Sequence, residues 1–230
     1  MQNAIAMCSV LITHFWAEKE MSIHFITNEM LLLLIGAGIG IGINLFLSIS
    51  VERIQKSQYE IDESIKKILA ALANGFERGK PDSDIEMNWL DEKLRKAKNE
   101  IEVASENALT IDLQYYREYI DMRRNQILLL KRVQRDLPRL GKIPPQAECL
   151  VMFLRKIVDT FGESNNAEAL LIQAEDTRQY FKKSDLPQSR EEFESRAALL
   201  HIFNELEHFL LLKYTFARSL SEEQKRKYWG

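Results

Sequence analysis

Residues 30–50 read MLLLLIGAGIGIGINLFLSIS, and residues 51–76 continue directly as VERIQKSQYEIDESIKKILAALANGF. The first stretch holds twenty-one residues and no charged side chain. At about 1.5 Å of rise per residue, its length matches the roughly 30 Å hydrocarbon core of a bilayer. A buried core helix of a soluble protein is the alternative, but soluble helices of this length normally carry a polar stripe. The stretch therefore predicts a transmembrane helix over residues 30–50.

A second apolar segment lies upstream, at residues 3–17 (NAIAMCSVLITHFWA). It is short for a complete span, and no Lys or Arg precedes it, which is atypical of a secretory signal. We expect it to be the end of a preceding membrane helix, in a chain that is truncated at its N-terminus.

Basic residues are distributed unevenly around the two apolar segments. Only Lys19 lies between them, whereas several follow residue 50: Arg53, Lys56, Lys66 and Lys67. Because basic residues are enriched on the cytoplasmic side of membrane helices, we expect residues 51–230 to be cytoplasmic.

Gly36, Gly38, Gly40 and Gly42 alternate through the predicted span, and three interpretations apply. A dinucleotide-binding loop would need GxGxxG, but the third glycine comes one position early and no alternating strand–helix pattern follows. Close packing of membrane helices is the second, because Gly36/Gly40 and Gly38/Gly42 form two GxxxG pairs on roughly opposite faces. A flexible span without a specific partner is the third. We favour packing against helices outside this chain.

Residues 51–230 have the apolar periodicity of helices, and no stretch alternates as a strand does. The first helix continues from residue 51 until Gly75, Gly79 and Pro81. The others are expected over about 82–107, 109–137, 146–160, 166–181 and 189–220. The sequence thus predicts an all-α protein with a partial membrane domain (1–50) and an antiparallel cytoplasmic helical bundle (51–230).

Charge divides between two of these helices. Residues 82–106 carry eight acidic and four basic side chains, and residues 117–142 carry eight basic and three acidic ones. Complementary solvated faces are one interpretation, with about 0–1 kcal/mol for each exposed ion pair. Contact of the basic helix with anionic lipid headgroups or an anionic ligand is the other, with Arg123 and Arg124 as candidate contacts. The net charge of −3 argues against nucleic-acid binding.

Metal and catalytic motifs are missing from the sequence. Cys8 and Cys149 lie far apart and outside any Cys/His cluster, which excludes a zinc finger or a disulfide scaffold. His201, Glu205 and His208 fall on the helix face opposite the apolar stripe, where we expect exposed polar side chains rather than a metal site. No nucleophile elbow, phosphate loop, HExxH or kinase motif occurs. We therefore expect no catalytic residues, no cofactor and no enzymatic activity.

Three separated segments carry a family resemblance: NEMLLLLIGAGIGIGINLF, YYREYIDMRRNQILLLKRV and LPQSREEFESRAALLHIFNELEHFLLLK. Over about residues 28–216 the chain resembles the aromatic acid exporter family, in particular its bacterial group with a membrane N-terminal half and a helical cytoplasmic C-terminal domain. The resemblance implies an integral protein of the bacterial plasma membrane that exports aromatic carboxylic acids. It transfers no catalytic or substrate-binding residues to this chain.

Two functions from different classes follow from these observations. The first is the C-terminal part of a membrane transporter, embedded in the bilayer and forming a homo-oligomer, whose helical domain serves assembly or regulation. Its substrate class, aromatic acids, rests on the resemblance alone. The alternative is a membrane-anchored interaction or sensor module without transport activity. An enzyme on a helical scaffold has no motif in its support.

Overall fold

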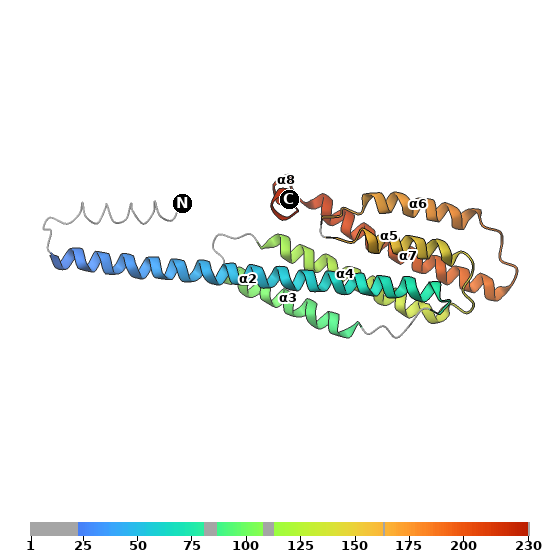
Figure 1. Cartoon of the computed structure of the whole chain (residues 1–230), viewed down its shortest axis with the longest axis horizontal. Coiled ribbons are helices and arrows are strands. Elements are labelled where there is room, and N and C mark those ends of the chain that lie inside the picture. The colour runs from blue at the N-terminus through green and yellow to red at the C-terminus, as the bar shows by residue number, and fades with distance from the viewer. Residues whose placement is uncertain (1–22, 81–86, 108–112, 163, 230) are drawn as a thin grey trace. The chain divides into compact units, whose positions relative to one another are not determined.

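The computed structural model of the chain describes residues 23–80, 87–107, 113–162 and 164–229. None of these described residues lies in a strand, which confirms the predicted all-α class. The helices are, in chain order, α2 (Ile23–Glu77), α3 (Asn88–Asn107), α4 (Gln114–Asp136), the short 3-10 helix η1 (Leu137–Arg139), α5 (Ala147–Asp159), α6 (Glu168–Lys183), α7 (Arg190–Ser219) and α8 (Glu222–Tyr228) (Figure 1). The apolar segment 3–17 lies outside the described residues.

The chain divides into two compact units, Met1–Glu52 and Arg53–Gly230. In the first unit, α2 exposes a series of large apolar side chains: Ile23, Met30, Leu31, Leu32, Leu33, Leu34, Ile35, Ile39 and Ile41. Across the described residues, no helix meets the length and apolarity needed to cross a membrane. The predicted span over residues 30–50 is thus not confirmed, and the side chains at 43–48 within it lie outside the description.

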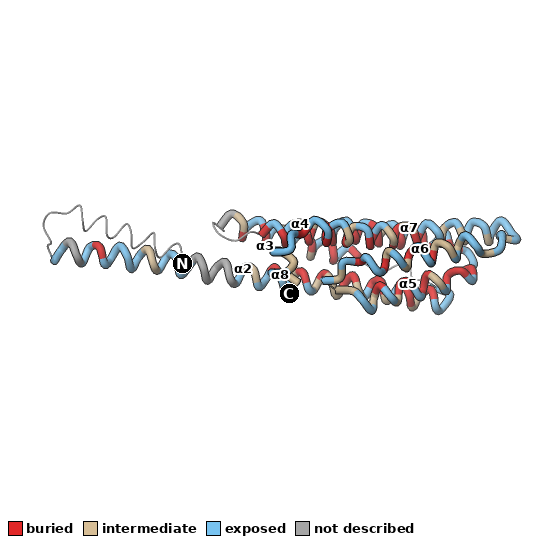
Figure 2. Tube along the Cα trace, turned by 90° about the horizontal axis from the view of Figure 1, so that it is seen from above, coloured by how far each residue is buried: buried red, intermediate tan, exposed pale blue. Residues whose placement is uncertain are grey.

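The second unit is a helical bundle whose core follows the apolar periodicity of the sequence. On α2, the predicted stripe is buried throughout: Ile54, Ile61, Ile65, Ile68 and Leu72. The stripe of α7 is buried in the same way: Leu199, Ile202, Phe203, Leu206, Phe209 and Leu210. Figure 2 shows buried stretches, in red, alternating with exposed ones along the helices of this unit. Burial of such stripes supplies most of the stability of a helical bundle.

Contacts between side chains fix the directions of the first helices in this unit. Ser57 Oγ donates a hydrogen bond to Glu100 Oε2 over 3.0 Å, and Lys93 Nζ donates to Glu60 Oε2 over 2.7 Å. Residue numbers rise along α2 as they fall along α3, so these helices are antiparallel.

The third helix returns to the direction of the first. Gln55 Nε2 of α2 donates to the Tyr116 hydroxyl of α4 over 3.0 Å. Further along both helices, Asp62 of α2 accepts from Arg123 of α4. Both sets of numbers rise together, so α4 runs parallel to α2. Among α2, α3 and α4, consecutive helices are therefore antiparallel, and α2 and α4 are parallel because two reversals separate them.

The end of α2 is set by backbone geometry at Gly79 rather than by Gly75. Gly79 has φ of +69°, and its N–H donates to Phe76 O over 3.0 Å. The Lys80 N–H donates to Gly75 O over 2.9 Å, which completes a Schellman motif. The prediction that Gly75 helps to end the helix is wrong, because Gly75 lies within α2, which continues to Glu77.

Replacing Gly79 with Ala tests this helix end. A Cβ at position 79 meets no atom within 4 Å, so the cost comes from the left-handed backbone alone. We expect the free energy of unfolding to fall by about 1–3 kcal/mol, measured for the full chain in mild detergent by urea titration with circular dichroism. Gly162→Ala is the matched control, since its Cβ also meets open space and its φ is not positive. Equal effects of the two substitutions would contradict the assigned geometry.

Candidate functional site

A buried arginine occupies the centre of the bundle. Arg123 of α4 is only 1% exposed and is among the largest fully buried side chains. A buried charge is costly unless other groups pair with it and satisfy its hydrogen bonds. The groups that do so come from other turns of α4 and from α2 and α7.

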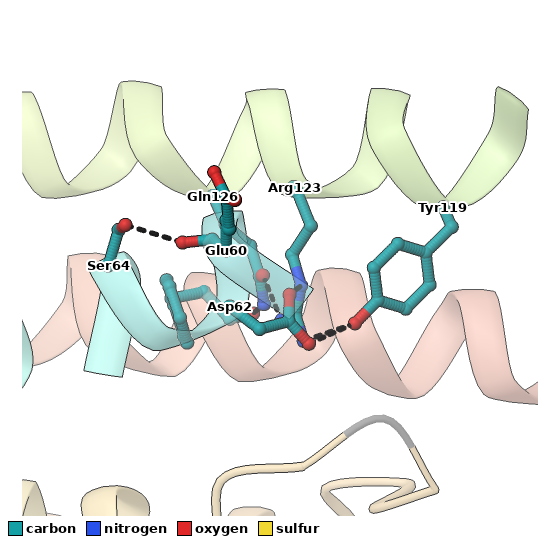
Figure 3. Close-up of polar contacts among 7 residues, drawn as sticks. Glu60, Asp62, Ser64, Tyr119, Arg123 and Gln126 are labelled. Carbon is teal, nitrogen blue, oxygen red and sulfur yellow. Dashed lines mark hydrogen bonds and ion pairs between the residues drawn. The ribbon is translucent and has the colours of Figure 1, made fainter. Parts of the chain in front are cut away.

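Asp62 of α2 is the ion-pair partner of Arg123 (Figure 3). Arg123 Nε donates to Asp62 Oδ1 over 2.8 Å, and Arg123 Nη2 donates to Asp62 Oδ2 over 2.9 Å. The guanidinium thus forms a bidentate interaction with both carboxylate oxygens, and this geometry makes Arg–carboxylate pairs strong and directional. The Asp62 side chain is 14% exposed.

Tyr119 and Gln126 complete the set of hydrogen bonds. One helical turn before Arg123, the Tyr119 hydroxyl accepts from Arg123 Nη2 over 2.7 Å and donates to Asp62 Oδ2. Arg123 Nη1 donates to Gln126 Oε1 over 2.7 Å, and Gln126 Nε2 donates to the backbone O of Phe209 on α7 over 2.7 Å. We call Asp62, Tyr119, Arg123 and Gln126 the polar core. It joins α2, α4 and α7 through one connected network.

Aromatic rings enclose the guanidinium. Arg123 Cζ lies 4.7 Å from the ring centroid of Phe161 and 4.9 Å from that of Tyr119. Burial lowers the pKa of Arg123, but its interactions with Tyr119 and Asp62 outweigh burial and raise that pKa overall. The guanidinium therefore stays charged inside the bundle.

A second buried cation, Lys213 of α7, lies on the same aromatic cluster. Its Nζ is 5.2 Å from the ring centroid of Tyr119 and 5.3 Å from that of Trp229. Trp229 Nε1 in turn donates to the Tyr115 hydroxyl over 3.2 Å, and the rings of Tyr115 and Tyr228 stack at 3.8 Å. These contacts attach the C-terminal helix α8, which the sequence analysis did not predict, to α4.

Beside the polar core is a pocket of about 340 Å³, lined partly by Asp62, Tyr116, Phe161 and Tyr228. Two carboxylates, Asp62 and Glu63, line this pocket. Asp62 already accepts hydrogen bonds from Arg123 and Tyr119, which leaves it poorly suited to act as a general base. In the parts of the chain that the structure describes, no group of three or more His, Cys, Asp or Glu side chains could hold a metal ion. The polar core is suited to holding helices in register.

The burial of Glu205, close to His201, differs from the predicted exposure. Glu205 is 6% exposed and Asp136 is 1% exposed, whereas the sequence placed Glu205 at the surface. His201 Nε2 lies 3.2 Å from Asp136 Oδ2, Arg139 pairs with Asp136 at 3.0 Å, and Arg132 lies 3.7 Å from Glu205. Packing of η1 and the end of α4 against α7 covers the face that helical periodicity alone assigns to solvent.

The structure separates the two arginines that the sequence paired as headgroup contacts. Arg124 is exposed on α4, where contact with an anion remains a prediction. Arg123 points into the polar core, so its guanidinium is not presented to a headgroup at the surface. The sequence analysis did not predict that Asp62 is the partner of Arg123. The spacing of Tyr119, Arg123 and Gln126 puts three polar side chains on the apolar face of α4, and this pattern could have indicated that Arg123 is buried.

Among the predicted packing glycines, the structure describes the surroundings of Gly38, Gly40 and Gly42. A Cβ added at any of these meets nothing within 4 Å. Packing at these glycines, and at Gly36, remains a prediction.

Asp62→Asn tests whether the polar core holds the bundle together. The variant leaves Arg123 buried without a counter-charge, and we expect unfolding free energy to fall by about 3–5 kcal/mol. The double variant Asp62→Leu/Arg123→Met removes both charges and should recover part of that loss. Urea titration of the full chain in mild detergent measures both effects.

Glu92→Gln is the control, because it removes the carboxylate of an ion pair with Arg95 whose two side chains are both exposed on the surface of α3. Exposed pairs contribute little, so this variant should unfold as the unmodified chain does. An Asp62→Asn variant as stable as Glu92→Gln would rule out a structural role for the polar core.

Two known proteins are similar to this chain over most of its length. A Bacillus subtilis (strain 168) protein described as "Uncharacterized protein YqjA" is 25% identical over 215 residues, covering 93% of this chain and 67% of that protein. A solved structure described as a "putative membrane protein from Clostridium difficile 630" matches with 26% identity and a TM-score of 0.55. It covers 73% of this chain and 99% of the solved one.

Two family models match consecutive parts of the chain. Residues 52–214 match "Putative aromatic acid exporter C-terminal domain", and residues 1–47 match "Aromatic acid exporter family member 1". The first match covers more than half of the chain and includes every residue of the polar core. These matches confirm the resemblance seen in the sequence, and the chain belongs to the aromatic acid exporter family.

Proposed function

We propose that this chain is the C-terminal part of an integral membrane exporter of aromatic carboxylic acids. The observation that carries the proposal is the pair of consecutive family matches over residues 1–47 and 52–214. The family is one of exporters rather than enzymes, and membership in it implies association with a membrane. That the exported compounds are aromatic carboxylic acids is proposed from the descriptions of the two family models.

The exposed apolar surface of α2 supports contact with lipid. The run of side chains from Met30 to Ile35 is exposed or partly exposed, and Ile39 and Ile41 follow. Soluble proteins rarely expose contiguous apolar surface of this kind, which typically marks an interface with a membrane or with other protein. We assign this segment to the bilayer of the bacterial plasma membrane.

Residues 51–230 then belong on the cytoplasmic side. The basic residues that follow position 50 favour that orientation. Asp62 of the polar core lies on α2, the helix that also carries the apolar segment. The bundle is therefore placed to influence the exporter through α2, by regulating transport or by supporting assembly.

Assembly as a homo-oligomer is part of the proposal. The open space around Gly38, Gly40 and Gly42 leaves room for a close-packed helix. Within the bundle, Leu128 of α4 and Leu211 of α7 are exposed beside one another in an open groove of about 700 Å³. Both features suit contact between copies of the chain.

Gly38→Leu/Gly42→Leu tests assembly through the glycines. Two bulky side chains should block close approach of a neighbouring helix, and we expect the oligomer to dissociate at least tenfold more readily while the bundle stays folded. Native mass spectrometry in detergent measures the oligomer, and circular dichroism measures the fold. Ile39→Leu/Ile41→Leu is the control, since it keeps side-chain volume on the same segment. Unchanged assembly in the glycine variant would count against helix packing at these positions.

Transport is tested by efflux of a preloaded hydroxybenzoate from cells that lack the gene. We expect the full gene, with any coding sequence in frame upstream, to restore efflux. A version ending at Ser50 should not restore it, because it lacks the bundle. A tag on each protein verifies equal amounts in the membrane fraction.

The outcomes separate the two functions. Efflux with the full gene alone makes residues 51–230 a required part of an exporter. A lack of gene-dependent efflux for every aromatic acid tried would contradict the exporter and favour a membrane-anchored interaction module.

A further inference from the structure

A basic groove lies between α2 and α3, apart from the polar core. Four cations line it together with two carboxylates: Arg53, Lys56, Lys93, Lys96, Glu60 and Glu100. The groove encloses about 260 Å³. The sequence identified Arg53 and Lys56 only as flanking charges of the predicted span, and their proximity to Lys93 and Lys96 of α3 is given by the structure.

Helical spacing explains how these side chains meet. Arg53, Lys56 and Glu60 follow one another at three and four residues on α2, and so lie on one face. On α3, Lys93, Lys96 and Glu100 have the same spacing. The antiparallel contact between α2 and α3 brings these two faces together.

The carboxylates in the groove are already engaged. Glu60 pairs with Lys93 at 2.7 Å, and Glu100 accepts from Ser57 over 3.0 Å. The hydrogen bond from Lys93 and then its charge lower the pKa of Glu60, and Lys56 and Lys96 add to that effect against opposing burial. Arg53, Lys56 and Lys96 keep exposed side chains. Four cations against two carboxylates leave an excess of two positive charges for an anion.

The groove begins immediately after the apolar segment of α2. Arg53 and Lys56 lie three and six residues beyond residue 50. At about 1.5 Å per residue, this is roughly 5–9 Å along the helix, and the headgroup region is about 5–8 Å thick on each side of the hydrocarbon core. Arg53 would then lie within the headgroup region and Lys56 at its outer edge. Basic clusters directly cytoplasmic of a membrane segment attract anionic lipids.

We propose that the basic groove binds the phosphate of an anionic phospholipid in the cytoplasmic leaflet. The inference rests on the proposed membrane location of residues 30–50. The lipid phosphate would contact Arg53, Lys56 and Lys96. The bundle is thereby held at the membrane surface by charge as well as by the chain connection.

The test uses the full chain in a neutral detergent, with phosphatidylglycerol, phosphatidylcholine or inorganic phosphate added. A ligand that binds the folded state raises its melting temperature, so the temperature as a function of lipid concentration gives an affinity. We expect phosphatidylglycerol to stabilise the chain more than phosphatidylcholine does. Lys56→Gln/Lys96→Gln should weaken the affinity for phosphatidylglycerol about 25-fold, at roughly a factor of five for each lysine.

Two further variants make the test specific. Lys182→Gln/Lys183→Gln removes two exposed lysines of α6 and should respond as the unmodified chain does. Glu100→Gln removes a negative charge and should strengthen the response. Circular dichroism verifies that each variant is folded before lipid is added.

An equal phosphatidylglycerol response in Lys56→Gln/Lys96→Gln and the unmodified chain would overturn the lipid site. So would equal responses to the two lipids. Stabilisation by inorganic phosphate that phosphatidylglycerol cannot increase would replace the lipid with a free anion. Because no transport is measured, a lipid response without gene-dependent efflux refutes only the exporter. Restored efflux without a lipid preference refutes only the basic groove.

Discussion

The buried ion pair between Asp62 and Arg123 is the interaction on which the bundle depends. Desolvating a guanidinium costs several kcal/mol, and a single carboxylate rarely compensates for it. Here Tyr119 and Gln126 supply further hydrogen bonds, and the ring of Phe161 covers one side. A network of this kind tolerates little displacement, because moving α2 along α4 would break the three hydrogen bonds that Asp62 accepts from Arg123 and Tyr119 while leaving Arg123 buried.

This constraint also determines what the surface of α2 presents. With Asp62 held against α4, the stripe containing Ile54, Ile61 and Ile65 is buried and the face carrying Lys56 and Glu60 meets α3. The polar core and the basic groove are therefore two consequences of one helix orientation. In an exporter of this family, they give the same helix a fixed connection to the bundle and a charged surface beside the apolar segment.

Sequence periodicity predicted the helices of the bundle well, because burial of an apolar stripe determines where a helix forms. The predicted end near residue 107 and the stripe of α7 agree with the structure. The polar core was not predictable in this way, since Asp62 and Arg123 are sixty-one residues apart in sequence. Arg123 was assigned to the surface by its charge and Glu205 by helical periodicity, and only tertiary packing shows that other helices cover them.

Hydrogen exchange of the full chain in detergent, with and without Asp62→Asn, tests most directly whether the polar core fixes α2 on the bundle. Amides that open only by local or global unfolding report the stability of each helix separately. The polar core predicts that residues 54–69 of α2 lose protection in Asp62→Asn by a larger factor than residues 174–180 of α6, because the hydrogen bonds of the polar core join α2, α4 and α7. Equal loss in the two helices, or unchanged protection of α2, would contradict that role.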